Sequence, residues 1–165
     1  MLENGTKALS QGNVVAYLVS TPNPMALAMA KYLWGSAQQI GLTVEGVLIN
    51  QGQVTDTISA DFAPLAIANL PEFDGNNWQS LVDNLPSMAG QVNAPKPIEF
   101  IMSERKIKVF LPGFDKKEVK LTQYGPEITI EAGDQRRNIT LPPAWRGSSV
   151  AGAKFQNGYL EVTVG

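Results

Sequence analysis

The pattern of apolar and polar positions divides the chain into two parts that predict different secondary structure. Before residue 91, continuous apolar runs alternate with a segment of helical periodicity, whereas after residue 97 only short alternating strand patterns appear. Between them, Pro95 and Pro97 lie among small and polar residues, which disfavours helix and holds the chain extended. We therefore predict two domains, residues 1–92 and residues 98–165, joined by a linker over residues 93–97.

The first part predicts a strand, a helix and a second strand. Residues 13–19 and 44–49 are nearly continuous apolar runs, which are typical of strands buried on both faces. Residues 25–40 between them carry apolar side chains at helical spacing, after Pro24 and before Gly41, which are start and stop signals. Strands connected in this way are parallel and the crossover is right-handed.

The remainder of the first part adds too little to complete a parallel sheet. We predict that Met25 and Met29 lie on the core face of the helix, that residues 51–59 are a polar turn, that residues 63–70 form a strand, and that Asp74 caps a short helix ending at Leu85. Parallel sheets need helices on both faces and usually more strands. We expect a piece of a larger doubly wound α/β domain; the alternative is a small self-sufficient α/β unit.

The second part predicts an antiparallel β-sandwich. Its apolar residues alternate with polar ones in short segments that are separated by turn residues. Asn157-Gly158 is the strongest turn signal, because both residue types tolerate positive φ. The predicted strand segments are residues 106–111, 119–121, 127–131, 138–141 and 159–164.

Composition and charge exclude several function classes. The chain has 165 residues, no Cys and no His, so thiolate nucleophiles, disulfides, His-dependent catalytic triads and zinc-thiolate sites are ruled out. The net charge of −2 gives no overall electrostatic case for nucleic acid or a membrane surface, and no segment approaches a membrane span of about 18 apolar residues. We expect a cytoplasmic protein without stable membrane insertion.

The second part resembles the α-crystallin (small heat-shock protein) domain. Three of its segments, residues 111–120, 136–142 and 153–160, are similar to that family's opening strand-turn-strand, its arginine-bearing strand ending in Leu-Pro, and its closing Ala, Gly and Leu pattern. The long loop that carries the exchanged strand in many members is missing, and no Ile-x-Ile follows Val164. The resemblance therefore implies an α-crystallin-like sandwich without large heat-shock-type oligomers.

The first part is similar to the C-terminal portion of the arsenite/anion-transporting ATPase family, which includes the ATPases that target tail-anchored membrane proteins. The similar segments are residues 15–27, 46–51 and 70–75. A subset of these ATPases carries an α-crystallin-like domain at the C-terminus, in the order found here. The expected fold class is therefore a partial doubly wound, P-loop NTPase-like α/β unit followed by an all-β α-crystallin-like sandwich.

The resemblance also implies what this chain does not carry. The family's phosphate-binding loop and switch aspartates lie upstream of the similar region, and no G-x-x-x-x-G-K-[ST] occurs in this sequence. Backbone N–H groups of such a loop cradle the phosphates, and its Ser or Thr holds Mg²⁺. We expect no cofactor, metal or ATP hydrolysis for this chain alone, although the complete architecture implies ATP and Mg²⁺.

The resemblance assigns four candidate nucleotide-binding residues. Asn50 corresponds to the residue that hydrogen-bonds the adenine edge, a task for which a carboxamide offers both a donor and an acceptor. Gln51 follows it, and Pro71 with Phe73 corresponds to an apolar lid over the base. The alternatives are an Asx turn for Asn50 and core packing for Pro71 and Phe73. No residue is assigned a catalytic role.

Three functions remain open at this stage. The first is the C-terminal module of an anion-transporting or tail-anchored-targeting type ATPase, which supplies the adenine-side wall and a chaperone-like accessory domain. Its partner is the missing ATPase core, upstream in the same gene or on another chain, and the sequence does not say whether Met1 is the natural start. The second is a free-standing holdase or interaction module, with hydrophobic clients or a second copy as partners. The third is a structural remnant without activity.

Overall fold

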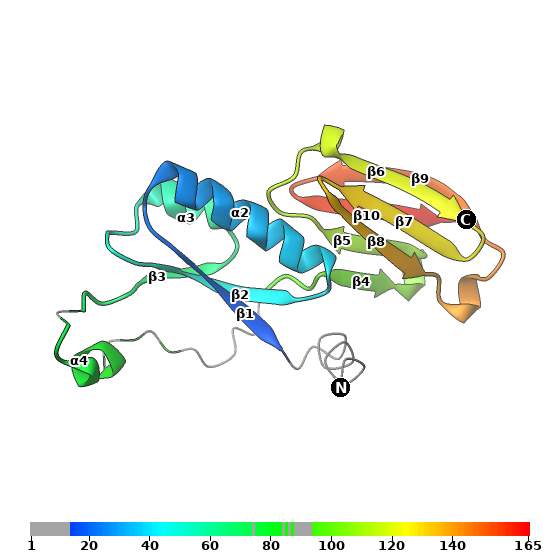
Figure 1. Ribbon diagram of the computed structural model, residues 1–165. Coiled ribbons are helices and arrows are strands. Elements are labelled where there is room, and N and C mark those ends of the chain that lie inside the picture. Colours follow the sequence, from blue (N-terminus) through cyan, green and yellow to red (C-terminus); the bar gives the residue numbers. More distant parts are fainter. Residues whose placement is uncertain (1–13, 74, 84, 86, 88–93) are drawn as a thin grey trace. The chain divides into compact units, whose positions relative to one another are not determined.

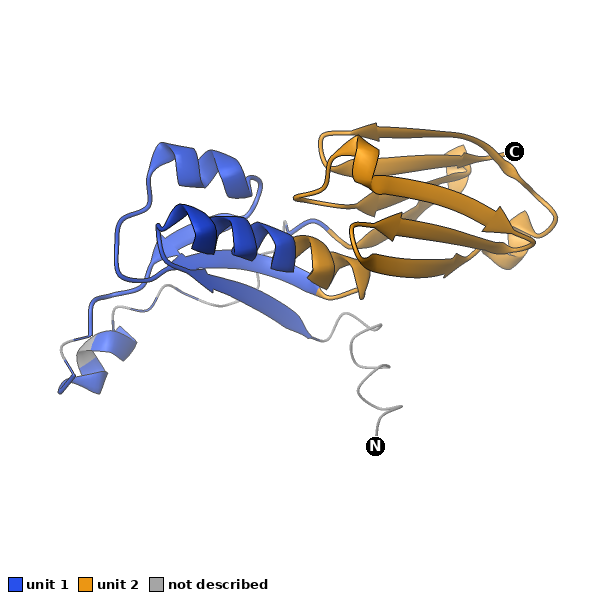
Figure 2. Ribbon diagram, turned by 45° about the horizontal axis from the view of Figure 1, so that its top comes forward, with its two compact units in different colours: residues 1–33, 43–95 blue, residues 34–42, 96–165 orange. Residues whose placement is uncertain are grey.

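The computed structural model describes residues 14–73, 75–83, 85, 87 and 94–165, and the chain divides into two compact units (Figures 1 and 2). The parallel unit comprises residues 1–33 and 43–95, and the sandwich unit comprises residues 34–42 and 96–165. No pattern in the sequence indicated that residues 34–42 group with the sandwich. The assignment of residues 93–97 as a linker stays a prediction, and only residues 94–97 of it are described.

The parallel unit contains the predicted strand–helix–strand arrangement. Its elements are β1 (Val15–Ser20), the first part of α2 (Pro24–Gln39), β2 (Thr43–Ile49), α3 (Asp56–Phe62), β3 (Ala66–Asn69) and α4 (Trp78–Asp83). The strand order is β1-β2-β3, and both neighbouring pairs are parallel. In Figure 1, α2 and α3 lie on the same face of this sheet, and Lys31 of α2 forms an ion pair with Asp61 of α3 at 2.5 Å.

Helix α2 begins where the sequence predicts, but its orientation is different. The Asn23 side chain accepts a hydrogen bond from the Met25 N–H at 2.9 Å, directly before Pro24, as expected of an N-cap followed by proline. Met25 and Met29 are 83% and 58% exposed, so the prediction that they face the core is wrong. The buried face carries Ala30 and Trp34 instead. Because this helix is apolar on both faces, its periodicity could not tell the two apart.

Helix α3 corrects the prediction of a polar turn over residues 51–59. Thr55 is its N-cap, since its hydroxyl accepts a hydrogen bond from the Ile58 N–H at 3.3 Å. Ile58 and Phe62, four residues apart, are both buried. Two apolar positions in seven residues are enough to dock one short helix, but they are too few to give a periodic signal.

The last two elements of the parallel unit agree with the prediction in kind and are shorter. β3 lies inside the strand predicted over residues 63–70, and α4 lies inside the helix predicted over residues 74–85. The predicted cap, Asp74, lies outside the described residues.

The sandwich unit confirms the predicted antiparallel β-sandwich. Its strands are β4 (Ile98–Ile101), β5 (Lys106–Phe110), β6 (Val119–Tyr124), β7 (Glu127–Ala132), β8 (Gln135–Thr140), β9 (Val150–Gln156) and β10 (Tyr159–Val164), with short 3₁₀ turns η1 (Met102–Glu104), η2 (Lys116–Glu118) and η3 (Pro143–Trp145). One sheet has the order β4-β5-β10-β9 and the other the order β6-β7-β8. All pairs within them are antiparallel.

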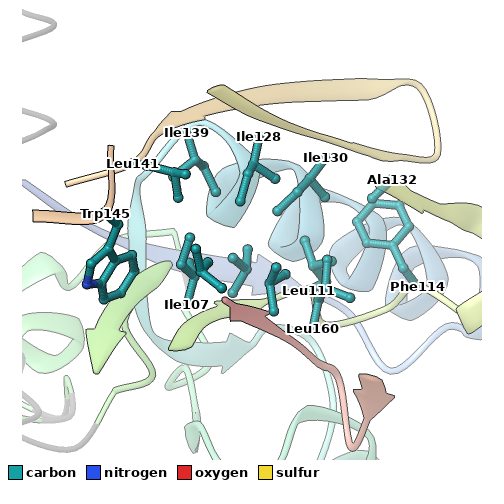
Figure 3. Close-up of a cluster of buried hydrophobic side chains, with 13 residues drawn as sticks. Ile107, Leu111, Phe114, Ile128, Ile130, Ala132, Ile139, Leu141, Trp145 and Leu160 are labelled. Atoms are coloured by element: carbon teal, nitrogen blue, oxygen red, sulfur yellow. The ribbon is translucent and has the colours of Figure 1, made fainter. Parts of the chain in front are cut away.

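The core of the sandwich comes from the inward-facing residues of both sheets, as Figure 3 shows. Alternate residues of β7, Ile128 and Ile130, are fully buried, as are Ile107 and Val109 of β5. Each such side chain stabilises the fold by about 1.5–3 kcal/mol through burial. The turn at Asn157-Gly158 has φ of 53° and 73°, which confirms the predicted tight hairpin.

Residues 34–42 pack within the sandwich unit through specific contacts. The ring of Trp34 meets the ring of Phe110 edge-on at a centroid distance of 5.4 Å. A Cβ at position 35 would lie only 2.6 Å from the Pro112 carbonyl oxygen. Only glycine, which has no side chain, therefore fits there. The Arg137 Nη1 donates a hydrogen bond to the Gln38 carbonyl in the last turn of α2 at 2.9 Å, and burial lowers the pKa of Arg137.

Candidate functional site

The carboxyl ends of the three parallel strands lie at one edge of the sheet and are joined by backbone hydrogen bonds. The Asn50 N–H donates to the Ser20 carbonyl at 2.7 Å, and the Leu70 N–H donates to the Ile49 carbonyl at 2.8 Å. These bonds hold the loop after β2 between the loops that follow β1 and β3. In open α/β sheets, ligands bind outside the carboxyl ends of the strands. This edge is therefore the first place to look for a site.

A cavity of about 660 Å³ lies at this edge, which is within the size range of small-molecule sites. It is lined by Asn50, Gln51, Gly52, Gln53, Leu70, Glu72 and Phe73. Three carboxamides and one carboxylate among seven lining residues make it mainly polar, with Leu70 and Phe73 as the apolar part. Such a surface suits a flat heteroaromatic ligand that has both hydrogen-bond donors and acceptors.

Three of the four residues that the sequence singled out meet in this cavity. Asn50 and Gln51 enter it from the end of β2, and Phe73 enters it from the segment after β3. Pro71 lies between two lining residues, Leu70 and Glu72, and does not itself line the cavity. The binding role of all four residues stays a prediction, but the structure does bring three of them together.

The loop after β2 has a conformation that depends on one glycine. Gln51 has a φ of 54°, in the left-handed region, and it precedes Gly52. A Cβ on Gly52 would collide with the ring of Pro22 in the loop after β1. The close approach of these two loops therefore requires a residue without a side chain at position 52.

Two carboxamides next to the cavity have defined orientations. The Val54 N–H donates to the Oδ1 of Asn69 at 2.9 Å, and the Asn69 Nδ2 donates to the Oε1 of Gln53 at 3.0 Å. A backbone N–H can only donate, so it requires the oxygen of Asn69 to face Val54. The amide nitrogen of Asn69 then faces Gln53, which must present its own oxygen in return.

An aromatic pair lies at the edge of the cavity. The rings of Phe73 and Trp78 are 4.1 Å apart between centroids, with an interplanar angle of 35°. The two side chains are 36% and 65% exposed. They offer an apolar surface that is open to the solvent on one side, as expected of side chains that cover a bound ring.

The sequence analysis missed four lining residues: Gly52, Gln53, Leu70 and Glu72. Each of them is a near neighbour in the sequence of one of the four candidate residues. The sequence therefore indicated the right segments, but it named too few of the residues in them. The left-handed Gln51 and the turn at Gly52 decide which side chains face inward, and no residue pattern encodes that. Leu70 could have been included as the apolar residue directly before Pro71.

The cavity suits a nucleobase better than phosphates or a metal ion. Among the described residues, its lining has no Lys, Arg or Ser/Thr side chain to bind phosphates, and Glu72 is the only charged one. Within the described ranges, no three carboxylates lie close enough to hold a metal ion. If ATP and Mg²⁺ bind in a complete architecture, the residues here would therefore hold the base, and the phosphates would need another segment.

None of the described helices is long and apolar enough to cross a membrane.

A second cavity, of about 640 Å³, lies in the sandwich unit and is more open. The Gln123 side chain makes three hydrogen bonds there: its Nε2 donates to the Gly125 and Ser148 carbonyls, each at 2.9 Å, and its Oε1 accepts from the Val150 N–H at 2.7 Å. The polar groups of this side chain are therefore satisfied within the protein. The lining residues are Gln123, Gly125, Pro126, Arg146, Gly147, Ser148 and Ser149.

Comparison with known proteins identifies the class of the sandwich. A family model described as an HSP20-like domain found in ArsA matches residues 103–164. The β-sandwich is thus a small-heat-shock-like domain, as its strand pattern and motifs predicted. This match supports a chaperone-like accessory module. An uncharacterized protein of Streptomyces coelicolor is 33% identical over 73 residues, which is 40% of this chain. The chain spans about a fifth (19%) of that relative's length.

Proposed function

We propose that this chain is the C-terminal module of an anion-transporting or tail-anchored-targeting type ATPase. In this function the parallel unit belongs to a P-loop NTPase-like domain and supplies the wall around adenine. The small-heat-shock-like domain acts as its chaperone-like accessory part. The phosphate-binding loop and the Mg²⁺ ligands belong to an ATPase core outside this sequence.

The observation that carries the proposal is the cavity at the carboxyl edge of the parallel sheet. Asn50, Gln51 and Phe73, which the resemblance assigns to the adenine site, all line it. An amide beside a flat apolar surface is the combination that adenine recognition needs, since the base has a hydrogen-bonding edge and two π faces.

Two further observations support a larger parent domain. Within the described part of the chain the parallel sheet has only three strands, and Val15 and Val19 on its edge strand β1 are 42% and 60% exposed. Parallel sheets normally have both faces covered, so these positions suit contact with additional α/β structure. The matching family is also described as a domain found in ArsA.

Nucleoside and nucleotide titrations of the complete chain test the proposal. Adenosine should bind weakly and shift the amide NMR signals of Asn50, Gln51 and Gly52. ATP should bind no more tightly than adenosine, because the described lining residues include no basic or hydroxyl side chain for phosphates. Adding the ATPase core should strengthen ATP binding, and Asn50→Ala should weaken it in that complex, whereas Asn138→Ala in the sandwich should not. ATP binding that Asn50→Ala leaves unchanged would exclude the adenine role.

A holdase is a second candidate, and the exposure of β9 favours it. β9 is an edge strand, and Ala151, Gly152, Ala153 and Lys154 are all exposed along it. An open strand edge can pair with an extended segment of an unfolded client. The complete chain should then suppress aggregation of a heat-denatured client at stoichiometric ratio without nucleotide. Failure at molar excess would exclude this candidate.

A further inference from the structure

Gln53 has a defined hydrogen-bonding polarity toward the cavity after β2. Its Oε1 accepts from the Asn69 Nδ2, and the orientation of Asn69 is in turn imposed by the Val54 N–H. Gln53 lines the cavity, and its Nε2 has no hydrogen-bond partner among the described residues. The Oε1 is held toward Asn69, so the group of Gln53 without a partner, which remains for a ligand in the cavity, is its Nε2, a donor.

We propose that Gln53 is a specificity-determining residue that selects a base with a ring-nitrogen acceptor, as in adenine, against a base with a ring N–H. This rests on the proposed function, in which the cavity receives a nucleobase. N1 of adenine is an acceptor and pairs with the Gln53 Nε2. Hypoxanthine and guanine carry a hydrogen on N1, so two donors would face each other and one would be left without a partner.

Asn69 sets this polarity from outside the cavity. It is the last residue of β3 and is not among the lining residues. Its side chain bonds to the Val54 N–H on one side and to Gln53 on the other. The backbone N–H can only donate, whereas the carboxamide of Gln53 can rotate by 180° and exchange its donor and acceptor. Residue 69 therefore controls which end of Gln53 faces the ligand without touching the ligand itself.

Asn69→Asp should reverse the selection. A carboxylate at position 69 still accepts from the Val54 N–H, but its second oxygen can only accept from Gln53. Gln53 must then turn its Nε2 toward residue 69 and present its Oε1 to the cavity. Gln53→Glu should have a similar effect, because one carboxylate oxygen accepts from Asn69 and the other faces the ligand.

Adenosine and inosine are the matched probes. They have the same sugar and nearly the same size, but the groups at positions 1 and 6 are reversed: a ring-nitrogen acceptor and an amino donor in adenosine, a ring N–H donor and a carbonyl acceptor in inosine. Their dissociation constants are measured on the complete chain from the NMR shifts of Gln51 and Gly52. We expect the native chain to prefer adenosine by roughly three- to ten-fold, the range for one hydrogen bond that solvent can reach. In Asn69→Asp and Gln53→Glu the preference should change toward inosine.

Asn138→Asp is the charge-matched control, since a carboxylate there keeps the hydrogen bond from the Thr129 hydroxyl at 3.0 Å in the sandwich unit. Its ratio of the adenosine and inosine dissociation constants should equal that of the native chain.

If adenosine binds at the cavity and neither Asn69→Asp nor Gln53→Glu changes this ratio, the proposed role of Gln53 is wrong while the proposed base site stands. If neither nucleoside shifts the signals of the cavity residues at millimolar concentration, both are wrong.

Discussion

Single carboxamide side chains satisfy backbone groups at the ends of strands in both units. Asn69 accepts from the Val54 N–H in the parallel unit, and Gln123 accepts from the Val150 N–H in the sandwich unit. Val54 lies in the loop after β2, and Val150 is the first residue of the edge strand β9, next to an irregularity in the pairing of β9 with β10. A carboxamide can replace a backbone neighbour because it has the same donor and acceptor groups as a peptide bond.

Gln123 is expected to stabilise the sandwich measurably. Gln123→Ala removes three hydrogen bonds, to Gly125, Ser148 and Val150, and leaves the Val150 N–H without its partner. The free energy of unfolding should fall by about 1–3 kcal/mol. Urea denaturation measures this change. Gln156→Ala, at an exposed position in β9, is the control and should stay within about 0.5 kcal/mol of the native chain.

Tyr17 is expected to ionise above its ordinary pKa of 10.0. Burial raises the pKa of Tyr17, and the hydrogen bond from its hydroxyl to the Glu45 Oε2 at 2.8 Å and the charge of that carboxylate raise it further. Glu45→Gln should lower the pKa but leave it above 10, because burial is the larger cause. The ultraviolet absorbance of phenolate, taken as the difference from Tyr17→Phe, measures it.

The same shift gives a direction for stability at alkaline pH. Because the folded-state pKa of Tyr17 is raised, the neutral phenol is favoured in the folded state. Its contribution to stability is complete below pH 10 and is lost as the pH rises through the folded-state pKa. Tyr17→Phe should remove this part of the pH dependence. A phenol that titrates at or below pH 10 in the native chain would contradict the assignment.

Helix α2 is the element whose two faces the sequence could not distinguish. Ala, Leu and Met residues occur around its whole circumference, so both faces fit the helical spacing of a core. The packing decides between them, because Trp34 reaches the ring of Phe110 within the sandwich unit while Met25 stays in solvent.

Substitutions on the two faces of α2 should differ strongly in effect. Trp34 is 2% exposed, and Trp34→Ala should lower the free energy of unfolding by about 3–5 kcal/mol through the cavity that it leaves. Met25 is 83% exposed, and Met25→Ala should change it by no more than about 0.5 kcal/mol. Thermal or urea unfolding of the two variants compares them directly. Equal losses would show that the outer face of α2 is buried in solution.

At the scale of the whole molecule, the two units differ in how much apolar surface they bury. The sandwich has two sheets that bury a continuous cluster from Ile107 to Val164, whereas the parallel sheet of the described residues has three strands and exposed valines on its edge strand. The first part of the chain also has few charged residues, as expected of a unit that buries further surface against a partner. Residues 1–96 carry three basic and seven acidic side chains, a smaller fraction than the roughly 25% charged residues of typical soluble domains.

If the proposed ATPase core lies upstream in the same polypeptide, the native polypeptide is larger than 17.8 kDa, the mass of this sequence. An antibody against the sandwich should then detect a heavier species in denaturing electrophoresis of source cells. The purified 165-residue chain on the same gel is the size standard. A single species at 17.8 kDa would contradict an upstream core in the same polypeptide and direct the search to a separate chain.

The sequence by itself determined the elements whose signals are local. Alternation in the five predicted strand segments between residues 106 and 164 and the turn at Asn157-Gly158 indicate the antiparallel sandwich, because strand faces repeat every two residues and a tight turn needs positive φ. Apolar runs on either side of a helix likewise define the parallel pair β1 and β2. Asn50, Gln51 and Phe73 came from resemblance, and the cavity contains all three.

The tertiary structure alone decided the features that depend on distant partners. It placed residues 34–42 with the sandwich, because Phe110 and Arg137, far away in the sequence, provide the contacts. It also added Gln53 and Glu72 to the cavity and set the polarity of Gln53 through Asn69, a residue 16 positions away. The type of a residue determines which hydrogen bonds its side chain can make. Only the folded structure determines which of these bonds are made within the protein and which groups remain for a ligand.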